Sequence, residues 1–209
     1  MTGVPALLAQ KSSPDGGLLV SRLFQLSMLW LLASAGVCFA ADWAVNTDHV
    51  SVNFAVSHFD ISYVHGRFGK IVTTVQFDPG TKAGLVVVTV DADSIDTGNR
   101  SLDGVLRSDQ FLDAGRNPEI RFVGNRFVFD GDRLTAVDGT LTLHGTERPL
   151  RLVVDRFVCK DVAAGIVSHF TCGGEMHTAF NRSDFGMKRF LPEVGDEVKL
   201  DIGIEAARR

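Results

Sequence analysis

The feature that most constrains the fold of this chain is an alternation of apolar and polar residues with a period of two. In the segment 50–58, Val50, Val52, Phe54 and Val56 alternate with small or polar residues. Successive side chains of a β-strand point to opposite faces, so this pattern predicts a strand with one buried face. The pattern returns repeatedly as far as Ala206.

Short turns separate the other segments that show this period. Residues typical of turns occupy 78–80, 130–132 and 145–149, and 160–165 is predicted to be a loop. Gly66 and Gly69 predict a bulge or a sharp bend inside the second strand. The strands predicted besides 50–58 are 63–77, 85–92, 120–129, 134–144, 150–159, 167–181 and 198–206.

One segment departs from the alternation. Leu102, Val105 and Leu106 follow a helical spacing, which predicts a short helix around 100–107. A looser turn then leads to Pro118.

These elements predict an all-β fold with about eight strands and one short helical insertion. Short turns without intervening helices favour antiparallel pairing, and closure into a barrel would remove exposed strand edges. The period alone leaves a β-sandwich open as the alternative. An eight-stranded antiparallel barrel either fills its interior with side chains or holds one small ligand.

The N-terminal segment 1–40 has the pattern of a secretory signal peptide. An apolar run at 23–35 is followed by small residues that place cleavage after Ala40, which leaves 41–209 as one domain. The run is shorter than the roughly 20 residues that span a bilayer, although a membrane anchor is the alternative. The sequence therefore predicts export.

Export changes the interpretation of the cysteines. Cys38 would leave with the signal peptide, and Cys159 and Cys172 would remain as a pair in an oxidising compartment. We expect a disulfide between them. Two buried thiols or half of a metal site are the alternatives.

Five local motifs follow one another along the chain, at 48–58, 66–69, 94–113 with Pro118 and Phe122, 139–145 and 181–187. Taken in this order, they resemble the YceI-like family of polyisoprenoid-binding proteins. The resemblance covers about 42–206. Two residues depart from the family pattern: Val50 replaces a small residue, and Gly104 stands where the family often has a histidine.

The resemblance implies a lipocalin-like barrel in the periplasm that holds a long isoprenoid or a similar amphiphilic lipid in a central apolar channel. It implies no established catalytic residues. A quinone is a further ligand of this kind. The membrane would serve only as the source of the lipid, and a homodimer is left open.

The candidate channel residues are the apolar side chains predicted to point inward, with His58 at the rim. An ordinary filled core is the alternative for each of them. Polar head-group contacts are assigned to Arg107, Asn181 and Arg182, which could equally be surface residues. The predicted channel residues are Phe54, Val56, His58, Phe68, Phe111, Phe122, Leu141, Leu152, Met176, Phe180 and Ile202.

Other functional classes find little support in the sequence. The net charge of −4 argues against a nucleic-acid partner. The six histidines show no metal-binding spacing, and there is no nucleophile elbow or phosphate-binding loop. We therefore expect no metal, cofactor or catalysis. An enzyme acting on a bound isoprenoid and a filled-barrel interaction protein remain the alternative functions.

Overall fold

The computed structural model describes residues 42–164 and 167–208, so the predicted signal peptide lies outside the described residues. The described part holds one α-helix, α2 (Arg100–Arg107), and three 3₁₀ helices, η1 (Thr47–His49), η2 (Ala92–Ser94) and η3 (Arg182–Phe185). Its strands are β1 (Asp42–Val45), β2 (Ser51–His58), β3 (Ser62–Phe68), β4 (Ile71–Asp78), β5 (Ala83–Asp91), β6 (Ile95–Asp96), β7 (Glu119–Asp130), β8 (Arg133–Leu143), β9 (Thr146–Ala164), β10 (Val167–Asn181) and β11 (Val194–Arg208).

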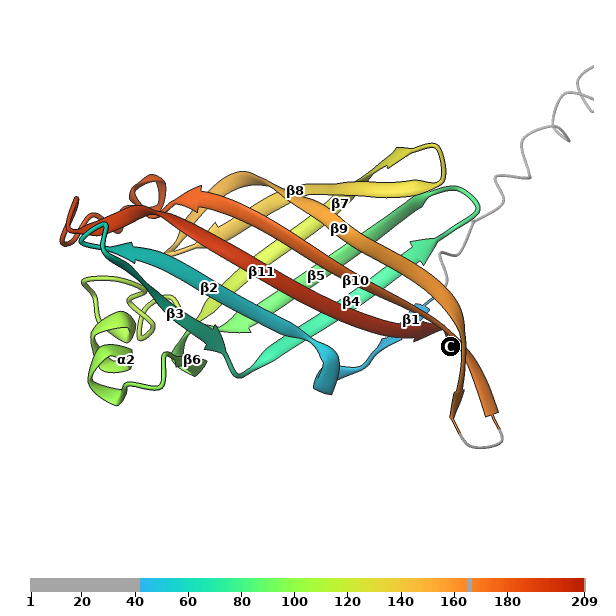
Figure 1. The fold of residues 1–209 in the computed structure, drawn as a ribbon, viewed down its shortest axis with the longest axis horizontal. Helices are drawn as coiled ribbons and strands as arrows, with labels where there is room; N and C mark the ends of the chain where they lie inside the picture. The colour runs from blue at the N-terminus through green and yellow to red at the C-terminus, as the bar shows by residue number, and fades with distance from the viewer. Residues whose placement is uncertain (1–41, 165–166, 209) are drawn as a thin grey trace, which may run out of the picture. The chain divides into compact units, whose positions relative to one another are not determined.

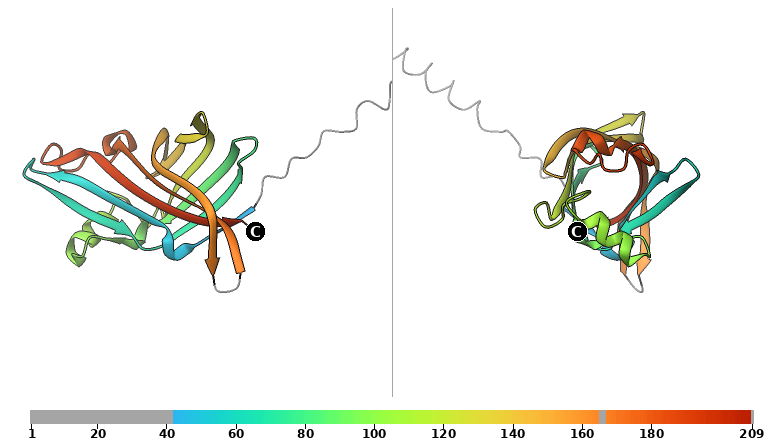
Figure 2. Two further views of the ribbon diagram at one scale, coloured as in Figure 1. Left: turned by 45° about the vertical axis from the view of Figure 1, so that its right-hand side comes forward. Right: turned by 90° about the vertical axis from the view of Figure 1, so that its left-hand side faces the viewer.

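The strands close into a barrel. The hydrogen-bonded order is β1, β4, β5, β7, β8, β9, β10 and β11, and β11 then pairs with β1. The right-hand view of Figure 2 looks along the barrel axis and shows this ring. All the pairings are antiparallel, which confirms the predicted eight-stranded antiparallel barrel over the sandwich.

Three further strands lengthen the wall on one side. β2 pairs with β11 and β3, and β3 pairs with β6. Consecutive strands thus lie end to end in the barrel wall: β2 follows β1, β4 follows β3, and β6 follows β5. The strand predicted at 63–77 is divided at Gly69 and Lys70, where the glycine predicted to bend it lies. The very short β1 and β6 were not predicted from the sequence.

The two ends of the barrel differ in what they carry (Figure 1). The end that carries α2, the β2–β3 turn and the β10–β11 connection is called the α2 end. The end that carries the β4–β5 and β7–β8 turns and the outer part of the β9–β10 hairpin is called the disulfide end, because Cys159 and Cys172 are bonded there. The predicted disulfide is therefore present in the structure.

The predicted helix coincides with α2. Asn99 caps it, because its side-chain oxygen accepts hydrogen bonds from the backbone N–H groups of Ser101 and Leu102. The buried Asp103 accepts hydrogen bonds from the N–H and hydroxyl of Thr97, at 2.8 and 2.7 Å. These bonds fasten α2 to the chain that follows β6. No helix of the described residues is long and apolar enough to cross a bilayer.

Two sequence predictions on β9 were wrong. The predicted turn at 145–149 is a tighter turn at His144 and Gly145, both with positive φ, and β9 starts at Thr146. The predicted loop at 160–165 is largely strand, because β9 continues in register with β10 as far as the pair of Ala164 and Val167. The polar residues of this hairpin give 160–165 the local sequence of a loop. The segment forms a strand because it pairs with β10, and the local sequence does not reveal that pairing.

Candidate ligand-binding cavity

The interior of the α2 end contains a cavity of about 590 Å³. Its walls are almost entirely apolar side chains, which come from β2, β3, α2 and the chain after it, the segment before β11, and the inward faces of β5, β7, β8, β10 and β11. This volume lies within the range of roughly 300–1,000 Å³ found for small-molecule sites. Phe59, Val105 and Phe190 line it and are also exposed to solvent, so the cavity reaches the surface at this end.

A narrower cavity of about 150 Å³ continues toward the disulfide end. Apolar cavities of about this size stay dry and accept small hydrocarbons. Trp43, Phe77 and Phe157 line its far part. The Thr73 hydroxyl is buried on its wall and has no hydrogen-bond partner among the described residues.

The two cavities adjoin. Five apolar residues line both of them and form a waist between them: Val52, Val90, Ile120, Leu141 and Leu200. These five side chains separate the two spaces along the barrel interior.

The structure places every predicted channel residue on a cavity wall. Those of the wide cavity are Phe54, Val56, His58, Phe68, Phe111, Leu141 and Phe180. Those of the narrow cavity are Phe122, Leu141, Leu152, Met176 and Ile202. The sequence missed the residues that α2 contributes to the wall, Leu102, Val105 and Leu106, although their helical spacing marked them as one face.

Gly66 gives Phe54 its place on the wall of the wide cavity. The two residues are paired across β2 and β3, and a Cβ at position 66 would overlap the Phe54 ring. The ring packs across the glycine and against Phe68, with the two ring centroids 5.9 Å apart. The glycine that predicted a bulge thus makes room for an aromatic side chain.

Arg182 is the buried cation of the wide cavity, with only 3% of its surface exposed. Its guanidinium donates hydrogen bonds to the carbonyl oxygens of Gly195, Met187 and Val194, at 2.9, 2.6 and 2.8 Å. These use three of its five N–H groups. Burial lowers the pKa of Arg182, and the carboxylate of Asp196 acts in the opposite direction.

The other predicted head-group residues do not line either cavity. Arg107 donates to the carbonyl oxygens of Asp93 and Ile95, both at 2.8 Å, and so ties α2 to the preceding segment. Asn181 is exposed in an outer groove beside Glu197. The structure therefore places these two side chains away from both cavities, and their contact with a head group stays a prediction.

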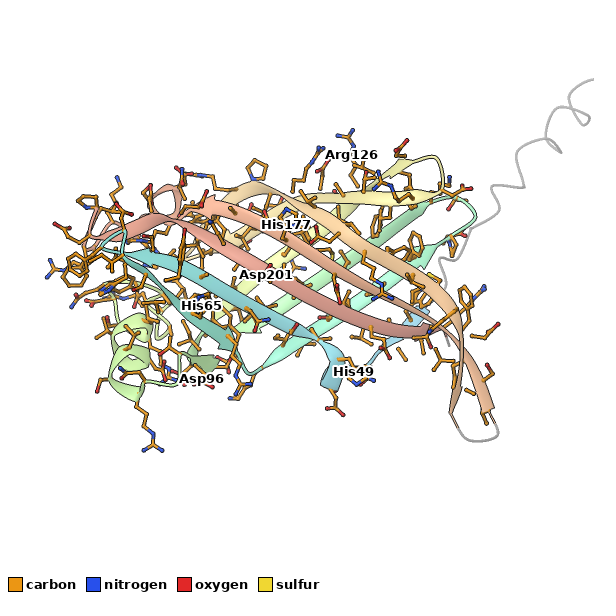
Figure 3. The ribbon with its side chains drawn as sticks, in the orientation of Figure 1. His49, His65, Asp96, Arg126, His177 and Asp201 are labelled. Carbon is orange, nitrogen blue, oxygen red and sulfur yellow. A yellow bond between two sulfur atoms is a disulfide. The ribbon has the colours of Figure 1, made fainter. Side chains whose placement is uncertain are left out.

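Polar side chains are concentrated on the outer wall. His65, His177 and Asp201 are exposed residues of this wall (Figure 3). His177 Nδ1 lies 2.8 Å from the carboxylate of Asp155 on the neighbouring strand. Among residues 42–164 and 167–208, no three His, Cys, Asp or Glu side chains lie close enough to hold a metal ion together.

Fold and cavity together define a closed antiparallel barrel with a hollow apolar interior. Residues 43–206 match the model of the YceI-like domain, and the chain belongs to the YceI-like family. This confirms the resemblance predicted from the sequence.

Relatives and solved structures agree with this assignment. A UPF0312 protein of Shewanella sp. is 30% identical over 91% of this chain and 98% of its own length. A UPF0312 protein of Pectobacterium atrosepticum is 28% identical over 92% of this chain and all of its own.

Among solved structures, the YceI protein of Campylobacter jejuni matches with a TM-score of 0.62 and 25% identity, over 73% of this chain and 90% of its own. BcnA of Burkholderia cenocepacia matches with a TM-score of 0.63 and 23% identity, over 77% and 98%. A polyisoprenoid-binding domain of Saccharophagus degradans matches with a TM-score of 0.56 and 17% identity, over 82% and 99%.

Proposed function

We propose that this protein is a periplasmic carrier that holds the hydrocarbon chain of a polyisoprenoid, or of a similar amphiphilic lipid such as a quinone, inside the barrel. It transports, stores or scavenges this lipid and does no chemistry on it. The observation that carries the proposal is the pair of adjoining apolar cavities along the barrel interior. The polyisoprenoid-binding domain of similar fold supports the class of ligand.

The energetics favour a long chain over a compact ligand. Each buried methylene contributes about 0.8 kcal/mol, so affinity grows with the length of chain that leaves water. The ordering of a flexible chain offsets part of this gain. Because the walls offer little but apolar surface, we expect the protein to select for chain length and thickness more than for the head group.

Arg182 is the proposed contact for a polar or anionic head group. It is a buried cation at the wide cavity, it forms no ion pair within the described residues, and two of its N–H groups have no protein acceptor there. A phosphate or quinone oxygen accepts hydrogen bonds from such a group. The chain would then extend from Arg182 through the waist toward Trp43.

Trp43 provides a direct test of this orientation. It lines the far part of the narrow cavity, and Trp30 is the other tryptophan of the chain. Cleavage after Ala40 would remove Trp30, so in the exported protein the fluorescence of Trp43 should respond to prenyl alcohols only when they are long enough to pass the waist. Shorter prenyl alcohols should still bind, as measured by native mass spectrometry, but should leave the fluorescence of Trp43 unchanged.

Leu200→Phe tests the role of the waist, because a larger side chain at this position narrows the passage between the two cavities. It should weaken binding of long prenyl alcohols by roughly ten-fold, because a few methylene groups are kept out of the narrow cavity. Binding of short ones should change little. Affinity that does not depend on chain length, together with an unresponsive Trp43, would overturn the proposal.

A further inference from the structure

Four exposed apolar side chains gather at the α2 end and form what we call the rim patch: Phe59, Ile61, Val105 and Phe190. Their exposed fractions are 56%, 87%, 41% and 46%. Phe59, Val105 and Phe190 also line the wide cavity. The apolar surface is therefore continuous from the cavity to the outside of the protein, at the end on the left of Figure 1.

The backbone of the rim patch is unfavourable for the residues that it carries. Phe59 and Asp60 have φ of 55° and 54°, and the N–H of Ile61 donates to the carbonyl of His58 at 3.1 Å. This is the geometry of a type I′ turn, which favours Asn-Gly. Phe190 also has a positive φ, 59°. Bulky residues persist at such positions where the surroundings hold them, often for function.

A hydrogen bond joins the two tips that carry these phenylalanines: the N–H of Phe59 donates to the carbonyl of Glu193 at 2.6 Å. Within the second tip, the N–H of Val194 donates to the carbonyl of Phe190 at 2.7 Å. The ring of Phe190 lies 6.2 Å from that of Phe111 on the cavity wall. The patch is thus a preformed surface held by both turns.

Two cations beside Phe190 have no anionic partner. Lys188 and Arg189 form no ion pair within residues 42–164 and 167–208, and the Arg189 guanidinium lies 4.5 Å from the centre of the Phe190 ring. Exposed aromatic rings next to Lys and Arg are typical of the interface between lipid head groups and water. Asp60 and Glu193 lie on the same tips, so apolar insertion would supply most of the attraction.

We propose that the rim patch docks on the surface of a phospholipid bilayer, with Phe59, Ile61 and Phe190 inserted among the head groups. A lipid would then pass between bilayer and cavity without exposing its chain to water, and exposure of each methylene costs free energy. This inference rests on the proposed function, because only a carrier of a water-insoluble chain needs such a surface. Val158, Val162 and Val167 at the disulfide end are also exposed, but they do not line either cavity.

The first experiment measures co-flotation of the purified protein with phosphatidylcholine vesicles that contain phosphatidylglycerol. Ile61→Ser should lower the partition coefficient by roughly ten-fold, because a largely exposed apolar side chain is lost. Ile61 does not line either cavity, so binding of a prenyl alcohol presented in detergent should be unchanged. Val72→Ser is the matched control, since Val72 is 70% exposed on the wall of β4, and it should float like the unchanged protein.

Phe59→Asn gives a second, independent readout. Asparagine suits the left-handed backbone, so the variant should keep or raise the melting temperature while its vesicle partition falls roughly ten-fold. A phenylalanine with a purely structural role would instead lower the melting temperature when replaced.

The outcomes separate this proposal from the proposed function. Vesicle binding that falls in Ile61→Ser and Phe59→Asn, but not in Val72→Ser, supports the docking surface. A protein that takes up prenyl alcohol from detergent but does not float with vesicles overturns the docking surface and leaves the carrier function intact. Equal loss of flotation in all three variants also overturns it. Failure to bind prenyl alcohol in any form would overturn the carrier function itself.

Discussion

The α2 end and the disulfide end of the barrel are built from equally apolar side chains but fill their interiors differently. At the disulfide end, Phe77 packs against Phe127, Phe129 and Phe157 with ring centroids 5.4–6.5 Å apart. The indole N–H of Trp43 on the neighbouring strand β1 donates to the Phe77 carbonyl at 2.9 Å. At the α2 end, Phe54, Phe68 and Phe180 surround the cavity of about 590 Å³ instead.

The hydrophobic composition of a barrel interior therefore does not decide how much space it leaves: the cavity is about 150 Å³ toward the disulfide end and about 590 Å³ at the α2 end. Aromatic rings stack on each other at one end because strands from several parts of the chain bring them to one level. At the other end, the insertion that carries α2 and the segment before β11 complete a wall of inward strand residues and leave the centre free. One barrel therefore combines a stable base with a space for a ligand.

The largest effect should come from removing one aromatic ring at each end. Phe77→Ala should lower the free energy of unfolding by about 3–5 kcal/mol, because a packed ring is lost and a cavity remains. Phe68→Ala should cost about half as much, since that ring lines the wide cavity and packs against one other phenylalanine ring, whereas Phe77 lines the narrow cavity and packs against three. Urea unfolding of both variants measures the difference, and equal losses of unfolding free energy would contradict the difference in packing between the two ends.

Removal of the disulfide should affect stability and leave the ligand site intact. Cys159 and Cys172 enclose a separation of 13 residues, and replacing both by alanine should cost about 3 kcal/mol. The bond lies at the end away from the wide cavity, so affinity for short prenyl alcohols should not change. Unfolding experiments and binding titrations on the same double variant check both parts. A loss of short-chain affinity would show that the two ends are not independent.

Thr73→Val should stabilise the disulfide end. The Thr73 hydroxyl is buried without a partner, and an isosteric apolar side chain removes its desolvation cost, a gain of about 1 kcal/mol. The neighbouring Thr74 is exposed on the same strand, so Thr74→Val is the control and should change stability little. A weaker affinity for long prenyl alcohols in Thr73→Val would instead assign a ligand contact to the hydroxyl.

The smallest effect concerns acid stability at the disulfide end. Lys82 Nζ lies 2.8 Å from Asp132 and donates to the Gly131 carbonyl at 2.7 Å, which joins the β4–β5 and β7–β8 turns. The hydrogen bond from Lys82, and then its charge, lower the pKa of Asp132. A carboxyl whose pKa is lower in the folded state stabilises the fold above its unfolded pKa of about 3.9, and this contribution is lost as pH falls below that value.

We therefore expect the melting temperature of the unchanged protein to fall more steeply below about pH 4 than that of Asp132→Asn. Because Asp132 is fully exposed, the difference should be small. Identical melting curves across this pH range would show that the ion pair does not contribute.

The sequence predicted what depends on local pattern. The period of two identified the long strands, the spacing of Leu102, Val105 and Leu106 identified α2, and alternation around Phe54 identified inward side chains. Export, itself a prediction, indicated that Cys159 and Cys172 form a disulfide.

Features that depend on distant pairing escaped the sequence. The carbonyl groups that accept hydrogen bonds from Arg182 belong to residues 187–195. The path of this segment is set by its contacts with the rest of the barrel. The extension of β9 to Ala164 depends on distant pairing in the same way. The size of the cavities could not be predicted either, because Phe68 and Phe77 follow the same alternation although they lie at different ends. Cavity volume is a property of the closed barrel.

The most direct test of a lipid-filled interior is organic extraction and mass analysis of the protein after gentle purification from its own cells. We expect a long-chain prenyl lipid at about one molecule per chain, because a barrel of this size holds a single ligand. A folded protein that yields no such lipid, and that takes up none when prenyl alcohols are supplied in detergent, would contradict it.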